Sequence, residues 1–357
     1  MNFIKDWWGR HFTDPQVVGL AIVLLAGFLV VYVAGGMLAP VLASVVIAYL
    51  LESPVQHLTA LRVPRVIAVI VVFSLFMASV GFLCFGVLPV LSQQTAQLLR
   101  QLPEMIAQGQ GLLLALPQRY PDLVTTEQVQ DIITAIRIEA IAFGQEVLSI
   151  SVASVLSVIT VLVYLVLMPL LVFFFLKDKV RLLRWLNAYL PADRELVSQV
   201  WMDVNLQIGN YVRGKVTEII IIGTVTYVTF LSMKLDFSLL LAVLNGLSVI
   251  IPYIGATVVT FPIVIIAYFQ FGITPDFWWV VGAYFVIQII DGNVLVPLMF
   301  SEVVNLHPIA IIVAILIFGG LWGFWGVFFA IPLATLVQAV LKAWPTSPGS
   351  AAGTGTA

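Results

Sequence analysis

Long apolar stretches alternate with polar segments along the chain, and their lengths predict helices that cross a membrane. A helix needs about 20 apolar residues to span the hydrocarbon core of a bilayer. A shorter apolar stretch, 38–51, has Pro40 near its start and Pro54 just after its end. We expect it to be a short returning helix buried in protein. Uncharged stretches of full or nearly full length occupy residues 17–36, 66–91, 148–176 and 219–233.

The polar segments between these stretches have a helical spacing of their own. Apolar residues recur at helical intervals in 92–147, interrupted at Pro103, and in 177–215, broken at Pro191. Amphipathic helices outside the hydrocarbon core fit both segments. The tail, 343–357, is low in complexity and is expected to be disordered.

The charge of these segments predicts which side of the membrane each one faces. Segment 177–215 carries seven Lys and Arg against four Asp and Glu, whereas 92–147 carries three against six. Cytoplasmic loops hold the excess of Lys and Arg, so 177–215 is expected inside and 92–147 outside. Counting crossings through the three helices expected in 17–91 then places 1–16 in the cytoplasm, and a bundle in 216–342 returns the C-terminus there.

The last third of the chain predicts helices that are broken inside the membrane. Segment 237–271 is interrupted by IPYIGA, where Pro252 removes a backbone donor and Gly255 permits a tight reversal. This segment is either a re-entrant hairpin or two short crossings. Segment 309–341 is too long for one straight crossing and is also expected to be a broken helix or a hairpin; it carries Gly319, Gly320, Gly323, Gly326 and Pro332.

Two interrupted elements beside a polar break are typical of the binding site of a transporter. The break follows the apolar run from Phe277 and contains Gln288, Asp291, Gly292, Asn293 and Pro297. An ionisable residue within a membrane span is energetically expensive and usually functional, which singles out Asp291. Capping of a helix end at the interface is the alternative for Asp291, and close helix packing is the alternative for the glycines. Asn245 either bonds across helices or faces the pathway, and Glu218 is expected to form a local ion pair with Lys215.

Composition supports a membrane protein and excludes several other classes. Hydrophobic residues make up 61% of the 357 and charged residues only 10%, with a mean hydropathy of +1.10. A net charge of −2 is too small to attract nucleic acid. One cysteine and three scattered histidines predict no disulfide, no metal site and no cofactor, and no phosphate-binding loop or catalytic motif occurs. We therefore expect no enzyme and no ATP-driven pump.

Five segments in order make the chain resemble the autoinducer-2 exporter family of bacterial inner-membrane proteins, closest to its PerM-like permease branch: 169–179 (PLLVFFFLKDK), 210–215 (NYVRGK), 251–256 (IPYIGA), 291–297 (DGNVLVP) with 305–308 (NLHP), and 319–334 (GGLWGFWGVFFAIPLA). The resemblance covers nearly the whole chain. It implies an all-α, multi-pass fold of about eight membrane helices with cytosolic termini and a homo-oligomer such as a pentamer. It also implies export of the quorum-sensing signal autoinducer-2 in some members and antiport of monovalent cations and protons in others.

The resemblance and the pattern together give the candidate residues. After Pro297, many members have a glycine where this chain has Ser301 and Glu302, which weakens any transfer of substrate. The candidate hinge and packing residues are the four glycines and Pro332 of 309–341. The candidate substrate-pathway residues are Asn245, Pro252, Tyr253, Gly255, Asp291, Gly292, Asn293 and Pro297.

The sequence thus predicts gradient-driven or facilitative efflux of a small polar solute, autoinducer-2 or a similar molecule. Half-helix ends around Tyr253, Asp291 and Asn293 would form the site, Asp291 would couple proton movement to export, and the C-terminal hairpin would move against it. A sodium or lithium/proton antiporter is the first alternative. The second is a membrane scaffold that transports nothing and acts through 92–147 and 177–215.

Overall fold

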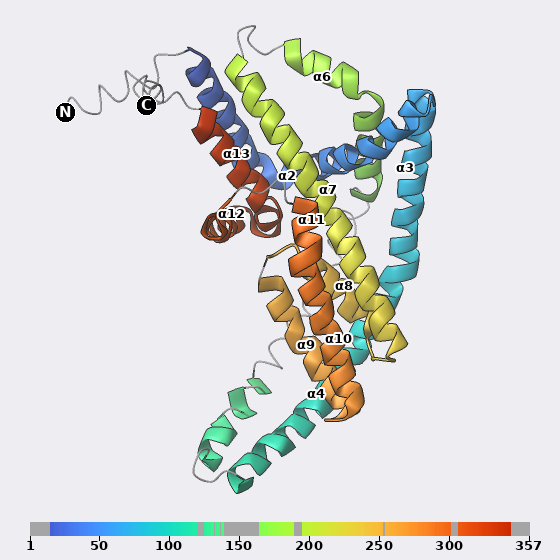
Figure 1. Cartoon of the computed structure of the whole chain (residues 1–357), viewed down its shortest axis with the longest axis vertical. Coiled ribbons are helices and arrows are strands. Elements are labelled where there is room, and N and C mark those ends of the chain that lie inside the picture. The colour runs from blue at the N-terminus through green and yellow to red at the C-terminus, as the bar shows by residue number, and fades with distance from the viewer. Residues whose placement is uncertain are drawn as a thin grey trace, which may run out of the picture.

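The fold is helical throughout the part of the chain that the computed structural model describes (Figure 1). Six helices in that part are long and apolar enough to cross a membrane, and three shorter ones are also apolar: Tyr164–Lys177, Ser238–Ser248 and Ala330–Leu341. The predicted all-α polytopic membrane protein is therefore confirmed. The described residues are 15–119, 125–131, 133–135, 137–138, 164–188, 195–252, 254–300 and 306–343.

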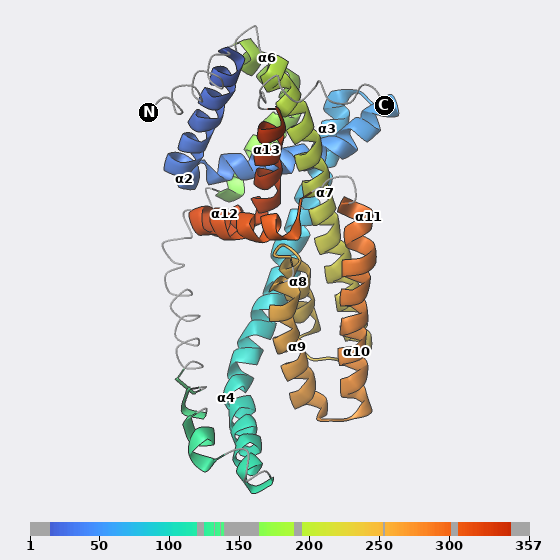
Figure 2. The ribbon, with the colours of Figure 1, turned by 60° about the vertical axis from the view of Figure 1, so that its left-hand side comes forward.

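The first helix, α2 (Pro15–Ala60), is longer than expected, because the predicted short returning helix 38–51 is continuous with the stretch before it. Figures 1 and 2 show α2 as two arms that meet at a bend. Pro40 supplies a physical reason, since proline lacks the N–H that would close the helical ladder. The Ser44 hydroxyl donates to the Pro40 carbonyl at 2.6 Å and lies 3.3 Å from the Met168 carbonyl. The predicted break is thus a bend within one helix.

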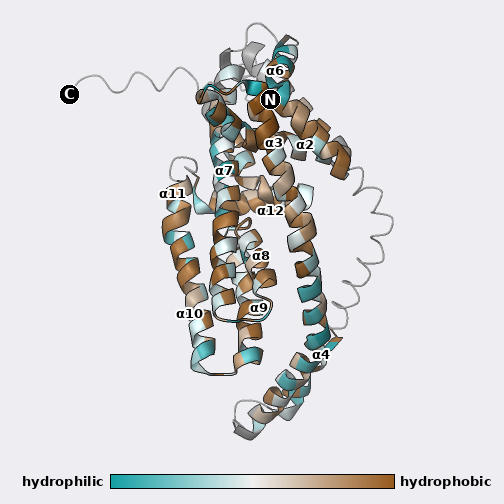
Figure 3. Cartoon of the chain, turned by 90° about the vertical axis from the view of Figure 1, so that its right-hand side faces the viewer, coloured by the Kyte–Doolittle hydropathy of each residue, from teal (hydrophilic) through white to brown (hydrophobic). Residues whose placement is uncertain are grey.

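The next helix is also continuous where two elements were expected. α3 (Arg65–Phe82), a π turn η1 (Leu83–Val87) and α4 (Leu88–Arg119) follow one another without a break, and Pro103 does not interrupt α4. The candidate membrane segment Arg65–Ala115 covers 51 residues, about 75 Å of helix, which far exceeds the ~30 Å of a hydrocarbon core. Figure 3 shows many hydrophilic residues along α4, so this helix is too long and too polar to lie wholly within a hydrocarbon core.

A buried carboxylate ties the inner end of this region together. Glu52 of α2 accepts two hydrogen bonds from the Arg65 guanidinium, at 3.0 and 3.1 Å, and lies 3.2 Å from Lys179. Arg65 also donates to the Leu176 carbonyl at 3.0 Å. The two cations compensate the Glu52 charge and join α2, α3 and the start of α6 (Lys179–Ala188).

The central helix is α7 (Glu195–Ser232), which packs against α2, α8, α10, α11 and α13. It merges the predicted helix after Pro191 with the predicted crossing 219–233, so no helix end separates them. Lys215, which the sequence assigns to a cytoplasmic loop, therefore lies inside the bundle. This correction matters for the site.

The predicted broken helix 237–271 is a hairpin of α8 (Ser238–Ser248) and α9 (Ile254–Phe271), with a non-helical tip between them. α8 is about 16 Å long, half the thickness of a hydrocarbon core. It packs closely on α7: a Cβ on Gly246 would lie 3.1 Å from the Gly223 Cα. α9 leads into α10 (Pro275–Ile290), a π turn η2 (Asp291–Leu295) and α11 (Val296–Phe300), which form one continuous span.

The predicted broken element 309–341 is confirmed as α12 (Pro308–Phe328) and α13 (Ala330–Ala343). Figure 2 shows α12 lying across the long axis of the molecule, whereas α13 runs along it. Gly323 adopts φ +58° inside α12, a left-handed conformation that only glycine adopts readily. A Cβ on Gly326 would overlap the Phe318 carbonyl oxygen, so glycine is required for this close turn as well.

Gly255 provides a test of the hairpin tip, because a Cβ there would overlap the Ser248 carbonyl oxygen. We expect Gly255→Ala to lower the free energy of unfolding by about 3 kcal/mol or more, the upper range for overpacking. The matched control is Gly282→Ala in α10, where a Cβ meets nothing within 4 Å and helix propensity gains up to about 1 kcal/mol. Thermal unfolding in detergent measures both variants; equal stability of the two would contradict the described tip.

Candidate functional site

Burial of charge locates the site. Four charged residues are buried within the described ranges: Glu52, Lys215, Glu218 and Asp291. Glu52 forms ion pairs with Arg65 and Lys179 where α2, α3 and α6 meet. The other three lie together where α7, the hairpin tip and η2 meet, and we name Lys215, Glu218 and Asp291 the charge cluster.

Lys215 is the centre of the charge cluster. It and Glu218 lie one turn apart on α7, and the Lys215 Nζ is 2.7 Å from the Glu218 Oε2, with both side chains at most 5% exposed. The same ammonium group donates to the Val249 carbonyl at 2.8 Å. The carbonyls at the C-terminal end of α8 carry partial negative charge, which favours a cation at this position. Lys215 therefore ties the hairpin tip to the middle of α7.

Asp291 is the second carboxylate of the charge cluster. It is 8% exposed and close enough to interact electrostatically with both Lys215 and Glu218. Its Oδ1 atom is buried without a hydrogen-bond partner in the described part of the chain. Since the span Pro275–Met299 continues through it as a π turn, Asp291 does not end the span, as the capping alternative supposed. π turns of this kind are frequent at functional sites.

A polar network accompanies the charge cluster. Asn245 of α8 is fully buried, and its Nδ2 donates to the Thr226 hydroxyl of α7 at 2.8 Å. The Gln288 amide of α10 donates to the Asn245 Oδ1 at 3.0 Å. Of the two alternatives for Asn245, the structure therefore shows the bond across helices.

The described residues of the site belong to three of the segments on which the family resemblance rests. Segment 210–215 ends at Lys215, 251–256 includes Pro252 of the hairpin tip and the start of α9, and 291–297 begins at Asp291. Segments far apart in the chain thus meet at one buried cluster.

Comparison with known proteins identifies the family of the chain. The model of the AI-2E family transporters matches residues 21–346. The chain belongs to the AI-2E transporter family. It is 47% identical to PerM of Escherichia coli (strain K12), named as a permease, over 97% of this chain and 98% of PerM. It is 25% identical to YrrI of Bacillus subtilis (strain 168), named as a transport protein, over 85% of each chain. It is also 25% identical to TqsA of Escherichia coli (strain K12), named as an AI-2 transport protein, over 91% of this chain and 92% of TqsA.

The structure of this AI-2E family member separates the remaining predicted residues into two groups. Pro252 lies in the hairpin tip and Gly255 in the first turn of α9, while Tyr253 lies outside the described residues. Gly292, Asn293 and Pro297 are exposed, and the Asn293 amide donates to the Ile289 carbonyl of its own helix. The glycines of α12 and the buried Pro332 of α13 belong to the C-terminal hairpin and not to the charge cluster: Gly319, Gly320, Gly323 and Gly326.

Sequence reasoning missed the importance of Lys215 and Glu218. The sequence predicts the ion pair, but at a helix start, because the uncharged stretch that predicts the crossing begins at residue 219. Apolar residues at helical spacing before VRGKVTE (Val204, Ile208 and Tyr211) and the apolar run after it are the signal in the sequence. A helix that extends through such a run buries its charges.

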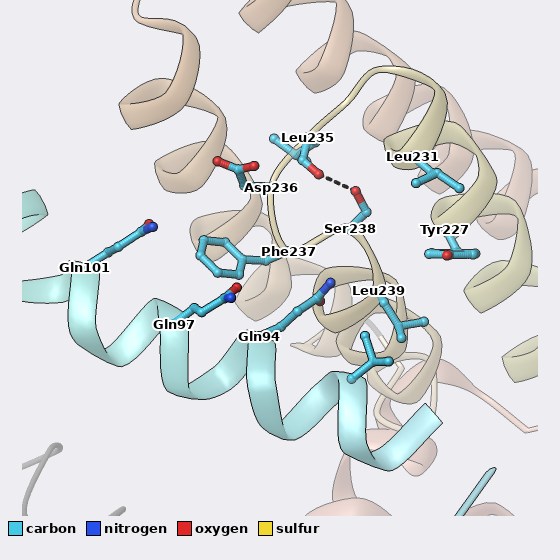
Figure 4. A pocket seen from close by; sticks show the side chains of 11 residues that line it. Gln94, Gln97, Gln101, Tyr227, Leu231, Leu235, Asp236, Phe237, Ser238 and Leu239 are labelled. Atoms are coloured by element: carbon cyan, nitrogen blue, oxygen red, sulfur yellow. Dashed lines mark hydrogen bonds between the residues drawn. The ribbon is translucent and has the colours of Figure 1, made fainter. Parts of the chain in front are cut away.

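A cavity of about 350 Å³ at the other end of α8 was also missed. Figure 4 shows Gln94, Gln97 and Gln101 on one face of α4, pointing toward the loop that carries Asp236 and Phe237. The spacing of these glutamines at helical intervals in LSQQTAQLLRQ was its signal in the sequence. The cavity and the charge cluster lie at opposite ends of the same half-length helix.

The Gln94 side chain also caps that helix. Its Oε1 accepts a hydrogen bond from the Leu240 backbone N–H at 2.8 Å, in the first turn of α8. The residue before α8, Phe237, makes no side-chain capping bond and has φ +57°, which is strained for a bulky residue. α4 thus holds the N-terminal end of α8, as Lys215 holds its C-terminal end.

The two asparagines offer a matched test of the polar network. Asn245→Ala would leave the Thr226 hydroxyl and the Gln288 amide without their buried partner, so we expect a loss of about 1–3 kcal/mol in the free energy of unfolding. Asn293→Ala, at an exposed position, should change it by less than about 0.5 kcal/mol. Chemical or thermal unfolding in detergent compares them. Similar values for the two variants would show that the network does not hold α8 between α7 and α10.

Proposed function

We propose that this protein exports a small polar solute, autoinducer-2 or a similar molecule, across the bacterial inner membrane, driven by an ion gradient or by the solute gradient itself. The observation that carries the proposal is the charge cluster, in which the buried Asp291 Oδ1 has no hydrogen-bond partner among the residues that the structure describes. Family membership supports transport, and the printed name of TqsA supports the kind of solute. The names of the relatives support neither cation antiport nor a scaffold, and the proposal includes neither.

Physical cost supports a transport role for the charge cluster. Ionisable side chains inside a membrane are expensive and are found mainly on ion and solute pathways. Irregular backbone at membrane depth is tolerated only where it is buried in protein or lines a cavity. The hairpin tip meets this condition, and a half-length helix that ends at a charged site is the arrangement typical of transporter binding sites.

The geometry suggests how export would proceed. Solute would pass between the α8–α9 hairpin and the α10–α11 span, and the cavity beside Gln94 would be its binding site on the outer side. Asp291 would accept and release a proton and so couple the gradient to the state of the tip. The C-terminal hairpin, α12–α13, packs on α7 through Tyr211, whose hydroxyl donates to the Phe328 carbonyl at 3.3 Å, and would move with it.

The orientation and surroundings are part of the proposal. The start of α2, α6 and the end of α13 lie at the same end of the molecule (Figures 1 and 2). α6 carries Lys179, Arg181 and Arg184, so the positive-inside rule supports this end, and both termini, as cytoplasmic. Large apolar side chains are widely exposed, as a lipid bilayer and a homo-oligomer would require; among them are Met37, Phe85, Leu298 and Leu316.

Transport into inside-out vesicles tests the proposal. We expect autoinducer-2 to accumulate under an imposed proton gradient with the wild-type protein, and Asp291→Asn to reduce the initial rate at least about tenfold by removing the titrating group. Asp276→Asn is the matched control, because Asp276 is exposed at the start of the same helix, α10, and its loss should leave the rate within about twofold.

Two results would count against the proposal in different ways. Unchanged gradient dependence in Asp291→Asn at matched expression would remove Asp291 from coupling. Absence of autoinducer-2 uptake by the wild-type protein would reject this solute.

A further inference from the structure

The charges of the cluster do not balance. Two carboxylates, Glu218 and Asp291, face a single ammonium group, that of Lys215, which leaves one negative charge uncompensated when all three are ionised. The remaining buried charge in the described ranges, Glu52, has its own cations. Burying an unpaired charge is strongly unfavourable, so the charge cluster as it stands requires one more positive charge.

Other titratable groups on the adjoining helices do not supply that charge. On α7, Tyr211 interacts electrostatically with Glu218 but is neutral or negative, never positive. Arg213 is directed to the Asn210 side chain at 2.8 Å and toward the Tyr49 ring. On α10, Tyr284 donates to the Ala256 carbonyl at 2.9 Å. Among the residues that the structure describes on α7 and α10, these groups bring no second cation to the charge cluster.

The geometry shows where the missing charge would reside. Lys215 is engaged by Glu218 and by the Val249 carbonyl, whereas the Oδ1 of Asp291 has no hydrogen-bond partner in the described part. A proton on either carboxyl group balances the charges.

We propose that the charge cluster binds one proton, which Glu218 and Asp291 share. The number is one because the positive charge of Lys215 compensates only one of the two carboxylates. The inference rests on the proposed function and deepens it, because it makes the three residues one titrating unit. When the proton leaves, Lys215 is drawn toward Asp291 and releases the Val249 carbonyl. Loss of that bond frees the hairpin tip, which links proton release to movement of α8.

Carbodiimide labelling counts the proton without any transported solute. Dicyclohexylcarbodiimide adds to protonated carboxyl groups in apolar surroundings, and mass spectrometry of the full-length protein in lipid vesicles identifies the labelled residue. We expect the wild type to carry one label per chain, divided between Glu218 and Asp291. In Glu218→Gln, Lys215 balances the remaining carboxylate, so the label on Asp291 should fall at least tenfold. Asp291→Asn should do the same to Glu218.

Removal of Lys215 together with one acid gives the decisive result. Lys215→Met/Glu218→Gln leaves one carboxylate and no cation, the same net charge as the wild type, so the label on Asp291 should return to within about twofold of one per chain. If this variant fails to assemble, Lys215→Met/Asp291→Asn has the same charge and should restore the label on Glu218. Both variants remove a carboxylate with the ammonium group, so neither leaves two buried acids unpaired.

The outcomes separate this inference from the proposed function. An Asp291 label that is unchanged in Glu218→Gln, or not restored in the double variant, overturns the shared proton. The expected labelling in a protein that transports no autoinducer-2 would uphold the shared proton and reject only the solute.

Discussion

The bond between the Lys215 ammonium group and the Val249 carbonyl is the interaction on which the inner half of this structure depends. It spans 2.8 Å and joins a continuous 38-residue helix to the end of an 11-residue one. α8 is too short to cross a bilayer and must end at membrane depth, where its last carbonyls lack helical partners. A buried ammonium group is the strongest donor that α7 can offer them, and Glu218 keeps that ammonium from being buried alone. The charge cluster therefore supplies a hydrogen-bond donor to a helix that ends inside the protein.

The two ends of α8 are held by different chemistry. At the C-terminal end the partner is the charged Lys215 ammonium group. At the N-terminal end the partner is the neutral Gln94 amide on α4, beside a cavity lined by further glutamines. Glycine-to-glycine packing of Gly246 on Gly223 lets α8 lie close along α7 between these ends. A short helix that is fixed by polar contacts at both ends and by small residues along its side can shift as a unit, which is what an alternating pathway requires.

The sequence predicted the fold class, the broken helices and Asp291, because each has a local signature: apolar length, Pro252 with Gly255, and a carboxylate inside an apolar span. It did not predict where helices continue. Pro40 and Pro103 indicated breaks, yet α2 and α4 run through them, since long helices packed on neighbours tolerate proline as a bend. The same error placed Lys215 in a loop. Its role depends on contacts with residues 34 and more positions away, which no local pattern records. Asn293 lies in the π turn, which changes the direction in which side chains leave the helix. The sequence does not specify this turn and so does not predict that Asn293 is exposed.

The most direct test asks whether the Lys215–Glu218 pair is buried at the centre of the bundle. It is a double-mutant cycle that measures the free energy of unfolding in detergent for Lys215→Met, Glu218→Gln and the double variant. Our account predicts that Lys215→Met alone lowers the free energy of unfolding by about 3–5 kcal/mol, as expected when one partner of a buried pair is removed. The double variant should recover much of this loss, with a coupling energy of at least about 2 kcal/mol. A coupling of about 0.5 kcal/mol or less, the value for an exposed pair on a helix surface, would contradict it.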